Sequence, residues 1–120
     1  VLIDPPYEAP GELDRVLAAF QAGAARFATG VYAAWYPIKH RSPVSTFHEG
    51  VRLNGLRDCV AAELWLREPT DPTRLNGCGL LVRNPPWGFE AAAAPMLQAL
   101  LGRLPIGPGA GSAVLRLTDE

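Results

Sequence analysis

Short apolar runs alternate with amphipathic segments along the chain. Residues 1–3 form an apolar run, which is typical of a parallel strand buried on both faces. Residues 10–27 then predict a helix, because apolar side chains recur at helical spacing along one stripe. The members of that stripe are Leu13, Val16, Leu17 and Phe20. Residues 31–36 are again apolar, so we expect a right-handed β-α-β unit with two parallel strands.

The remainder of the chain predicts helices on either side of a hairpin. In order, the predicted elements are a helix of mixed polarity over residues 43–55, strands over residues 58–67 and 78–83, a helix over residues 89–104 and a strand over residues 113–117. The two strands at residues 58–83 are joined by a short, turn-rich connection, which favours antiparallel pairing. The Ala- and Leu-rich helix is expected to lie mostly in the core, with a later start because Pro95 falls near its first turns.

Composition narrows the class of protein. The 120 residues suit one domain with a single core, and 48% hydrophobic and 19% charged residues indicate a globular chain. A net charge of −1 gives no global basic signature for nucleic acid, although local patches remain compatible with it. With no membrane-length apolar run and no visible signal peptide, we expect a cytoplasmic protein without a membrane partner. Cys59 and Cys78 favour free thiols in a reducing compartment, with a disulfide across the hairpin as the alternative.

The first apolar run ends in Asp4-Pro5-Pro6-Tyr7. Neither proline can donate to a strand ladder, so these residues predict a stiff loop at the carboxyl end of a strand, where α/β sheets bind ligands. The Asp4 carboxylate and the proline carbonyls are hydrogen-bond acceptors, and Tyr7 offers a flat face for stacking. Together they suit a planar group that bears an exocyclic amine. The alternative is an ordinary strand-to-turn junction with a capping aspartate.

The second apolar run is closed by Pro37 and followed by the basic residues Lys39, His40 and Arg41. Its carboxyl end should lie on the same sheet edge as the Asp4 loop, so one interpretation is a patch that contacts phosphates. The other is a solvated loop, and both stay open. His40 and His48 lack a credible set of partners for zinc, so no metal site is predicted.

A second Pro-Pro turn, Asn84-Pro85-Pro86-Trp87, repeats the same chemistry. Only one of the two turns can be the functional loop. If the strand before Asn84 runs antiparallel, Asn84 lies on the edge opposite Asp4, and its turn is structural with Trp87 packed. The alternative is that Asn84 is the functional residue and Asp4 is structural. The rule for ligand-binding edges favours Asp4.

The Asp-Pro-Pro-Tyr sequence resembles motif IV of the amino-methyltransferases, which methylate N6 of adenine or N4 of cytosine from S-adenosyl-L-methionine. The whole chain is similar to the RlmJ-type family, which methylates N6 of an adenine in large-subunit (23S) ribosomal RNA. The stretches that carry this likeness are residues 2–8, residues 26–30 together with Tyr32, residues 35–37 and residues 84–87. The likeness implies an α/β fold: the second half of a class I (Rossmann-like) methyltransferase sheet, with parallel strands and a C-terminal antiparallel hairpin. Residues 1–120 would form one partial domain, the C-terminal half of the catalytic domain.

The resemblance also implies roles for individual residues. The catalytic residues that hold the target adenine would be Asp4, Pro5, Pro6 and Tyr7, and Asp4 would also bind the cofactor. Trp35 and Tyr36 would line or buttress the pocket, and Lys39 and Arg41 would contact RNA phosphates. A DNA amino-methyltransferase and a non-enzymatic interaction domain remain alternatives.

The sequence departs from the class I pattern in its cofactor site. The glycine-rich turn after the first strand and the acid after the second are both missing. Residues 107–111 are glycine-rich but precede a strand, so they do not form a cofactor loop of that kind. The chain begins inside an apolar run at Val1, which suggests that an N-terminal half is absent. We therefore expect an unpaired sheet edge at residues 1–3, and no methyl transfer by these 120 residues alone.

Overall fold

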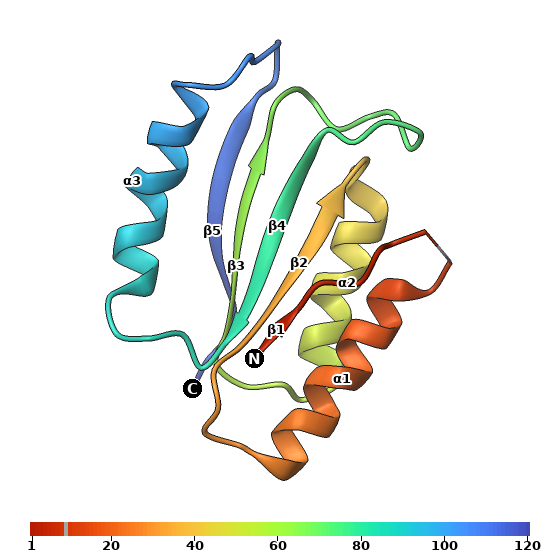
Figure 1. The fold of residues 1–120 in the computed structure, drawn as a ribbon, viewed down its shortest axis with the longest axis vertical. Helices are drawn as coiled ribbons and strands as arrows, with labels where there is room; N and C mark the ends of the chain where they lie inside the picture. Colours follow the sequence, from red (N-terminus) through yellow and green to blue (C-terminus); the bar gives the residue numbers. More distant parts are fainter. Residues whose placement is uncertain (9) are drawn as a thin grey trace.

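The computed structural model describes residues 1–8 and 10–120, which form one sheet with helices on both faces (Figure 1). The strands are β1 (Leu2–Ile3), β2 (Tyr32–Ile38), β3 (Cys59–Trp65), β4 (Gly77–Arg83) and β5 (Gly111–Thr118). The helices are α1 (Glu12–Arg26), α2 (Arg41–Leu53) and α3 (Phe89–Leu101). Every element that the apolar pattern predicts is therefore present.

The strand order across the sheet is β1-β2-β4-β3-β5. β1 and β2 are parallel, and β3 and β4 form an antiparallel hairpin, as predicted. β4 also pairs antiparallel with β2 along its whole length, and β5 pairs antiparallel with β3. The sheet is therefore mixed and mostly antiparallel. This corrects the expectation of a parallel sheet with a terminal hairpin, because β4 occupies the place beside β2 that a further parallel strand would take.

The face of the sheet beneath α1 and α2 holds the main core. Val16, Leu17 and Phe20 are buried there, because helical spacing puts them on one side of α1. Alternate residues of β2 are buried on the same face, since successive strand side chains point to opposite faces. Helix α2 adds the buried side chains Val44, Phe47 and Val51.

Helix α3 lies on the opposite face and covers it only in part. Its residues Phe89, Ala93 and Leu97 line an apolar hollow of about 320 Å³ with Trp35 and Leu80. The prediction that this helix is mostly core is wrong, because only two of its side chains are buried, namely Ala93 and Leu101. The predicted later start is also wrong: α3 begins at Phe89 and contains Pro95.

Strand β1 is an edge strand that only β2 pairs. Val1 and Leu2 are 70% and 72% exposed, while Ile3 packs against the core. The prediction of a strand buried on both faces is therefore wrong for Val1 and Leu2. Within the described residues no strand pairs with the outer side of β1, and the side chains of Val1 and Leu2 face solvent.

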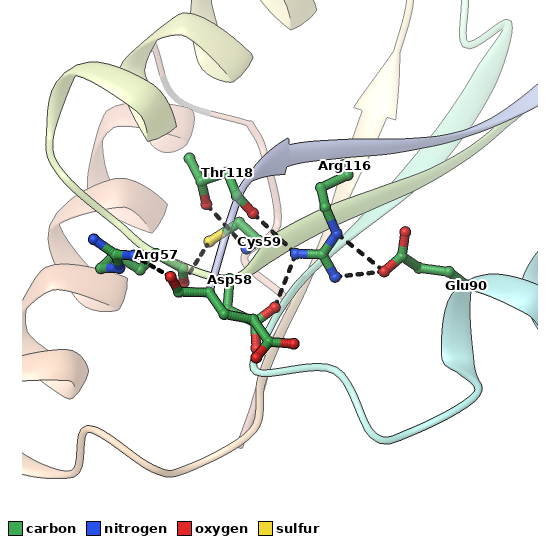
Figure 2. A network of polar contacts seen from close by, with 7 residues as sticks. Arg57, Asp58, Cys59, Glu90, Arg116 and Thr118 are labelled. Atoms are coloured by element: carbon green, nitrogen blue, oxygen red, sulfur yellow. Dashed lines mark hydrogen bonds and ion pairs between the residues drawn. The ribbon is translucent and has the colours of Figure 1, made fainter.

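An ion-pair network fastens α3 to the sheet at the amino end of β3 (Figure 2). The Arg116 guanidinium of β5 donates to Glu90 on α3 and to Asp58 just before β3. The two carboxylates raise the pKa of Arg116 above its ordinary value, so the arginine stays charged. This edge lies opposite the carboxyl ends of β1 and β2, so the network supports the fold away from the Asp4 loop.

The two cysteines are free thiols. Cys59 pairs in register with Arg83, and Cys78 pairs with Leu64, so the thiols lie at opposite ends of the hairpin. Their separation along the strands is roughly 16 Å at about 3.3 Å per residue, which excludes the disulfide alternative. Burial raises the pKa of the Cys59 thiol. In the part of the chain that the structure describes, no helix has the length and apolar character needed to cross a membrane.

Candidate functional site

The Asp4–Tyr7 loop lies at the carboxyl end of β1, next to the carboxyl end of β2. The two strands are parallel, so the loop and the basic residues after β2 share one edge of the sheet. β4 runs antiparallel to β2, which places Asn84 at the opposite edge. The predicted separation of the two Pro-Pro turns is therefore confirmed, whereas their roles stay predictions.

Tyr7 ties the loop to β2. Its hydroxyl donates to the carbonyl of Trp35 at 2.5 Å, and the two rings meet edge to face with centroids 5.8 Å apart. The backbone of Tyr7 has a φ of 56°, which is uncommon for a residue with a side chain. Burial, followed by the negative charges of Asp4 and Glu12, raises the pKa of Tyr7 from 10.0 to about 12. The ring that the sequence suggests for stacking is thus half-buried against Trp35.

Asp4 faces an open hollow. Its exposed side chain lines a space of about 410 Å³ with Leu2, Trp35 and Leu80. Among the described residues, no backbone or side-chain donor is bonded to the Asp4 carboxylate. A capping aspartate would accept such a bond, so this geometry favours a carboxylate that is available to a ligand.

A second hollow of about 390 Å³ lies between the loop and the starts of α1 and α2. Tyr7, Pro37 and Phe47 give it an apolar wall, and Lys39 and His40 give it a basic rim. The Nδ1 atom of His40 is buried there without a hydrogen-bond partner in the described structure. The hollow is large enough for one nucleotide-sized group, since small-molecule sites typically start at about 300 Å³.

The structure brings together only some of the residues predicted to bind substrate. Trp35 shares a hollow with Asp4, and Lys39 shares one with Tyr7. Tyr36 instead points into the α1–α2 core and is fully buried, so buttressing is the only one of its two predicted roles that this geometry supports. The Arg41 guanidinium donates to Glu68 at 2.8 Å and lies over the ring of Trp65, and Arg41 lines neither of these two hollows.

The second Pro-Pro turn has a structural environment. The Asn84 amide donates to the carbonyls of Ala28 at 2.8 Å and Gly30 at 2.9 Å, which ties the end of β4 to the loop before β2. This engaged amide favours the structural interpretation. The prediction that Trp87 is packed is wrong, because its side chain is fully exposed. It lies between the proline pair and Gly88, beyond the end of the sheet.

Sequence reasoning missed a buried polar network beside the site. It joins Tyr36 of β2, Glu63 of β3 and His48 of α2. Two signals were available. Glu63 is the only charged residue in the apolar run from Cys59 to Trp65, and His48 shares the helical spacing of Val44 and Val51. No group of three or more His, Cys, Asp or Glu side chains among the described residues is arranged to hold a metal ion.

The raised pKa of Tyr7 predicts alkaline destabilisation that depends on its hydroxyl. The folded state holds the neutral phenol, so its contribution to stability is complete below pH 10 and is lost as the pH rises toward 12. We expect the free energy of unfolding by urea to fall across this window, and Tyr7→Phe to reduce the fall. Buried Tyr36 contributes in the same direction, so Tyr36→Phe is the matched comparison. An identical pH profile in wild type and Tyr7→Phe would contradict the prediction.

The sequence matches a family of known proteins along nearly its whole length. The family model described as "RsmJ: Ribosomal RNA large subunit methyltransferase D, RlmJ" covers residues 1–116. The chain belongs to this RlmJ family.

Two curated relatives are named ribosomal RNA large subunit methyltransferase J. The protein from Haemophilus influenzae is 38% identical over 112 residues, which is 93% of this chain and 40% of that protein. The protein from Escherichia coli K12 is 34% identical over 110 residues, which is 91% of this chain and 39% of that protein.

A solved structure has the same fold. The crystal structure of a Legionella pneumophila protein of the DUF519 family superposes with a TM-score of 0.82 and 28% sequence identity. The match covers 96% of this chain and 42% of that one. This RlmJ-family chain therefore spans about two fifths of the length of the relatives it matches. The Asp4–Tyr7 loop lies within the segment that the RlmJ family model covers.

Proposed function

We propose that this RlmJ-family chain supplies the target-base half of an S-adenosyl-L-methionine-dependent methyltransferase. The substrate is the N6 amino group of an adenine in 23S ribosomal RNA. The observation that carries the proposal is the exposed, unbonded carboxylate of Asp4 beside the hollow lined by Trp35. Family membership and the names of the two relatives support RNA methylation.

The proposed chemistry is mainly positioning. The Asp4 carboxylate and the Pro5 carbonyl accept hydrogen bonds from the amino group, so that the nitrogen lone pair points at the methyl group to be transferred. No strong base is needed, because the neutral amine would form the N–C bond as the methyl–sulfur bond of the sulfonium breaks and leaves a neutral thioether, and the product would then release one N–H proton to water. Pro6 stiffens the loop, and Tyr7 fixes it to β2 through the Trp35 carbonyl. Trp35 forms one wall of the hollow in which the adenine lies.

The cofactor would provide an electrophilic methyl group, and the described residues fit only part of its site. Asp4 is the residue that we propose faces it. The glycine-rich residues 107–111 lead into β5, and the backbone N–H of Gly107 bonds to Leu66 rather than opening a helix. The residues present therefore do not form a complete cofactor pocket. The isolated 120 residues are proposed to be inactive.

The remaining contacts of the cofactor are proposed to come from an N-terminal half of the same domain. Such a half would complete a class I, Rossmann-like sheet beside β1, whose parallel pairing with β2 supports this architecture. It would cover apolar surface that is now open, including Leu2, Trp35 and Leu80. The full-length protein is proposed to act on RNA in the cytoplasm.

Contacts to the RNA backbone are proposed for the basic residues after β2. Lys39 and His40 lie on the rim of the second hollow, which we propose holds a nucleotide next to the target. Arg41 is a weaker candidate, because it must first leave Glu68 and Trp65.

The test compares this chain with the full-length protein. Calorimetry measures S-adenosyl-L-methionine binding, and mass spectrometry locates any methyl group added to an unmodified 23S ribosomal RNA fragment. We expect binding and adenine N6 methylation by the long protein only. Methyl transfer by the short chain would refute the partial-site proposal. Binding by neither protein would shift the assignment to a non-enzymatic interaction domain, and preference for a matched DNA would shift it to a DNA methyltransferase.

A further inference from the structure

Three buried polar side chains form a network on the α1–α2 face of the sheet. Tyr36, Glu63 and His48 are 0%, 6% and 9% exposed. The Tyr36 hydroxyl donates to Oε2 of Glu63, and Nε2 of His48 lies 2.9 Å from the same oxygen. The base-holding chemistry proposed above uses none of these groups. The network can therefore contribute only by fixing the positions of the side chains that it joins.

The network crosses the intervening strand at a glycine. Tyr36 on β2 and Glu63 on β3 both pair in register with Gly79 on β4. A methyl carbon at position 79 would lie 2.2 Å from Cζ of Tyr36, so the tyrosine ring occupies the space of a missing side chain. The phenol thereby reaches a carboxylate two strands away. This arrangement fixes the position of Tyr36 from both β3 and α2.

Burying a carboxylate beside a phenol and an imidazole is costly unless the groups satisfy one another. Satisfied networks of this kind restrict the groups within them to one arrangement. Phe47 packs edge to face on the Tyr36 ring with centroids 5.1 Å apart, which leaves the ring little room to move. Tyr36 is therefore among the most constrained side chains on β2.

Tyr36 is also next to the residue that holds the Asp4–Tyr7 loop. β1 pairs with β2 only at Ala33 and Ala34. One position further along β2, the Trp35 carbonyl accepts the Tyr7 hydroxyl in place of a ladder bond. The loop is thus attached to β2 directly beside the anchored Tyr36.

We propose that Glu63, together with His48, is a positioning residue for the Asp4–Tyr7 loop and acts through Tyr36 and Trp35. The inference rests on the proposed function, because it assigns to Glu63 an effect on methyl transfer. Glu63 does not touch the substrate. It sets where the Trp35 carbonyl lies, and hence where Tyr7 holds the Asp4 acceptor.

The experiment uses the full-length protein with the substitution Glu63→Gln, which keeps the size of the side chain and removes its charge. We expect kcat for RNA methylation to fall about tenfold, since a misplacement on the order of 1 Å costs up to about 100-fold. Affinity for S-adenosyl-L-methionine should stay unchanged. Val60→Ala is the matched control, because Val60 is a buried residue of the same strand that points to the other face.

A double-mutant cycle tests whether Glu63 acts on methyl transfer through the Tyr7 hydroxyl. If Glu63 acts through the Tyr7 hydroxyl, Glu63→Gln changes kcat by less than about twofold in a Tyr7→Phe background. In protein labelled with 3-fluorotyrosine, the Tyr7 fluorine signal should shift in Glu63→Gln and stay in place in Val60→Ala. Additive effects on kcat, or a Tyr7 signal that does not move, would overturn the inference. Tyr36→Phe carries the same test if Glu63→Gln does not fold.

The two proposals fail in different ways. If the wild-type protein methylates no RNA, the proposed function fails, while the fluorine signal still shows whether Glu63 positions Tyr7. If methylation requires Asp4 but is indifferent to Glu63, the proposed function stands and the positioning role is removed.

Discussion

Replacing Asp4 with alanine in the full-length protein is expected to lower kcat for RNA methylation by at least about 100-fold, the loss typical of removing one preorganised hydrogen-bonding group from an active site. The side chain is exposed and lines the hollow with Leu2, Trp35 and Leu80, so its loss leaves the packing intact. The melting temperature should therefore change little. Radioactive methyl transfer to the RNA fragment measures the effect.

Two further variants make the Asp4 result specific. Asp4→Asn keeps one acceptor oxygen for the amino group, and should retain more activity than Asp4→Ala. Asp119→Ala removes an exposed carboxylate after β5, at the other edge of the sheet, and should leave kcat unchanged. Full activity in a folded Asp4→Ala protein would contradict the prediction. It would favour the alternative that residues 4–7 are an ordinary strand-to-turn junction.

The elements of the fold could be predicted because each depends on local periodicity. The buried stripe of α1 and the hairpin of β3 and β4 both follow from spacings within a few residues of the chain. The place of β4 between β2 and β3 could not be predicted from local spacing, since an apolar run does not specify which strand it pairs with. Gly79 was the available clue, because a glycine inside a strand often marks a close approach by another group.

The location of the candidate site could be predicted from the sequence, but the directions of its side chains could be predicted only in part. The rule for strand ends located the Asp4 loop, because the rule depends only on strand direction. Trp35 and Tyr36 were assigned together, although consecutive strand residues point to opposite faces. Trp35 lines the hollow beside Asp4, whereas Tyr36 is buried in the α1–α2 core, where it can buttress that hollow but not line it. The exposure of Trp87 could not be foreseen, since it depends on where α3 begins to cross the sheet.

The substitution Gly79→Ala is expected to destabilise the protein by about 3 kcal/mol or more. The added methyl would lie 2.2 Å from Cζ and 2.5 Å from the hydroxyl of Tyr36. The ring cannot turn aside easily, because Phe47 packs on it and Glu63 binds its hydroxyl. Overpacking of a core typically costs 1–3 kcal/mol, roughly, and a buried polar group that loses its partner costs about as much again.

A second glycine provides the control for this prediction. A methyl carbon on Gly107 would have its nearest neighbour at 3.7 Å, an ordinary contact, so Gly107→Ala should change the unfolding free energy by less than about 0.5 kcal/mol. Urea unfolding measures both variants. Adding Tyr36→Leu to Gly79→Ala should recover the part of the loss that comes from the clash, and leave the part that comes from the unpaired Glu63. A Gly79→Ala protein as stable as the Gly107→Ala protein would mean that Tyr36 has another place to go, and that the network does not fix it. The Gly79→Ala result therefore shows whether Tyr36, Gly79 and Glu63, which lie in register across β2, β4 and β3, form a rigid support or one in which Tyr36 can move.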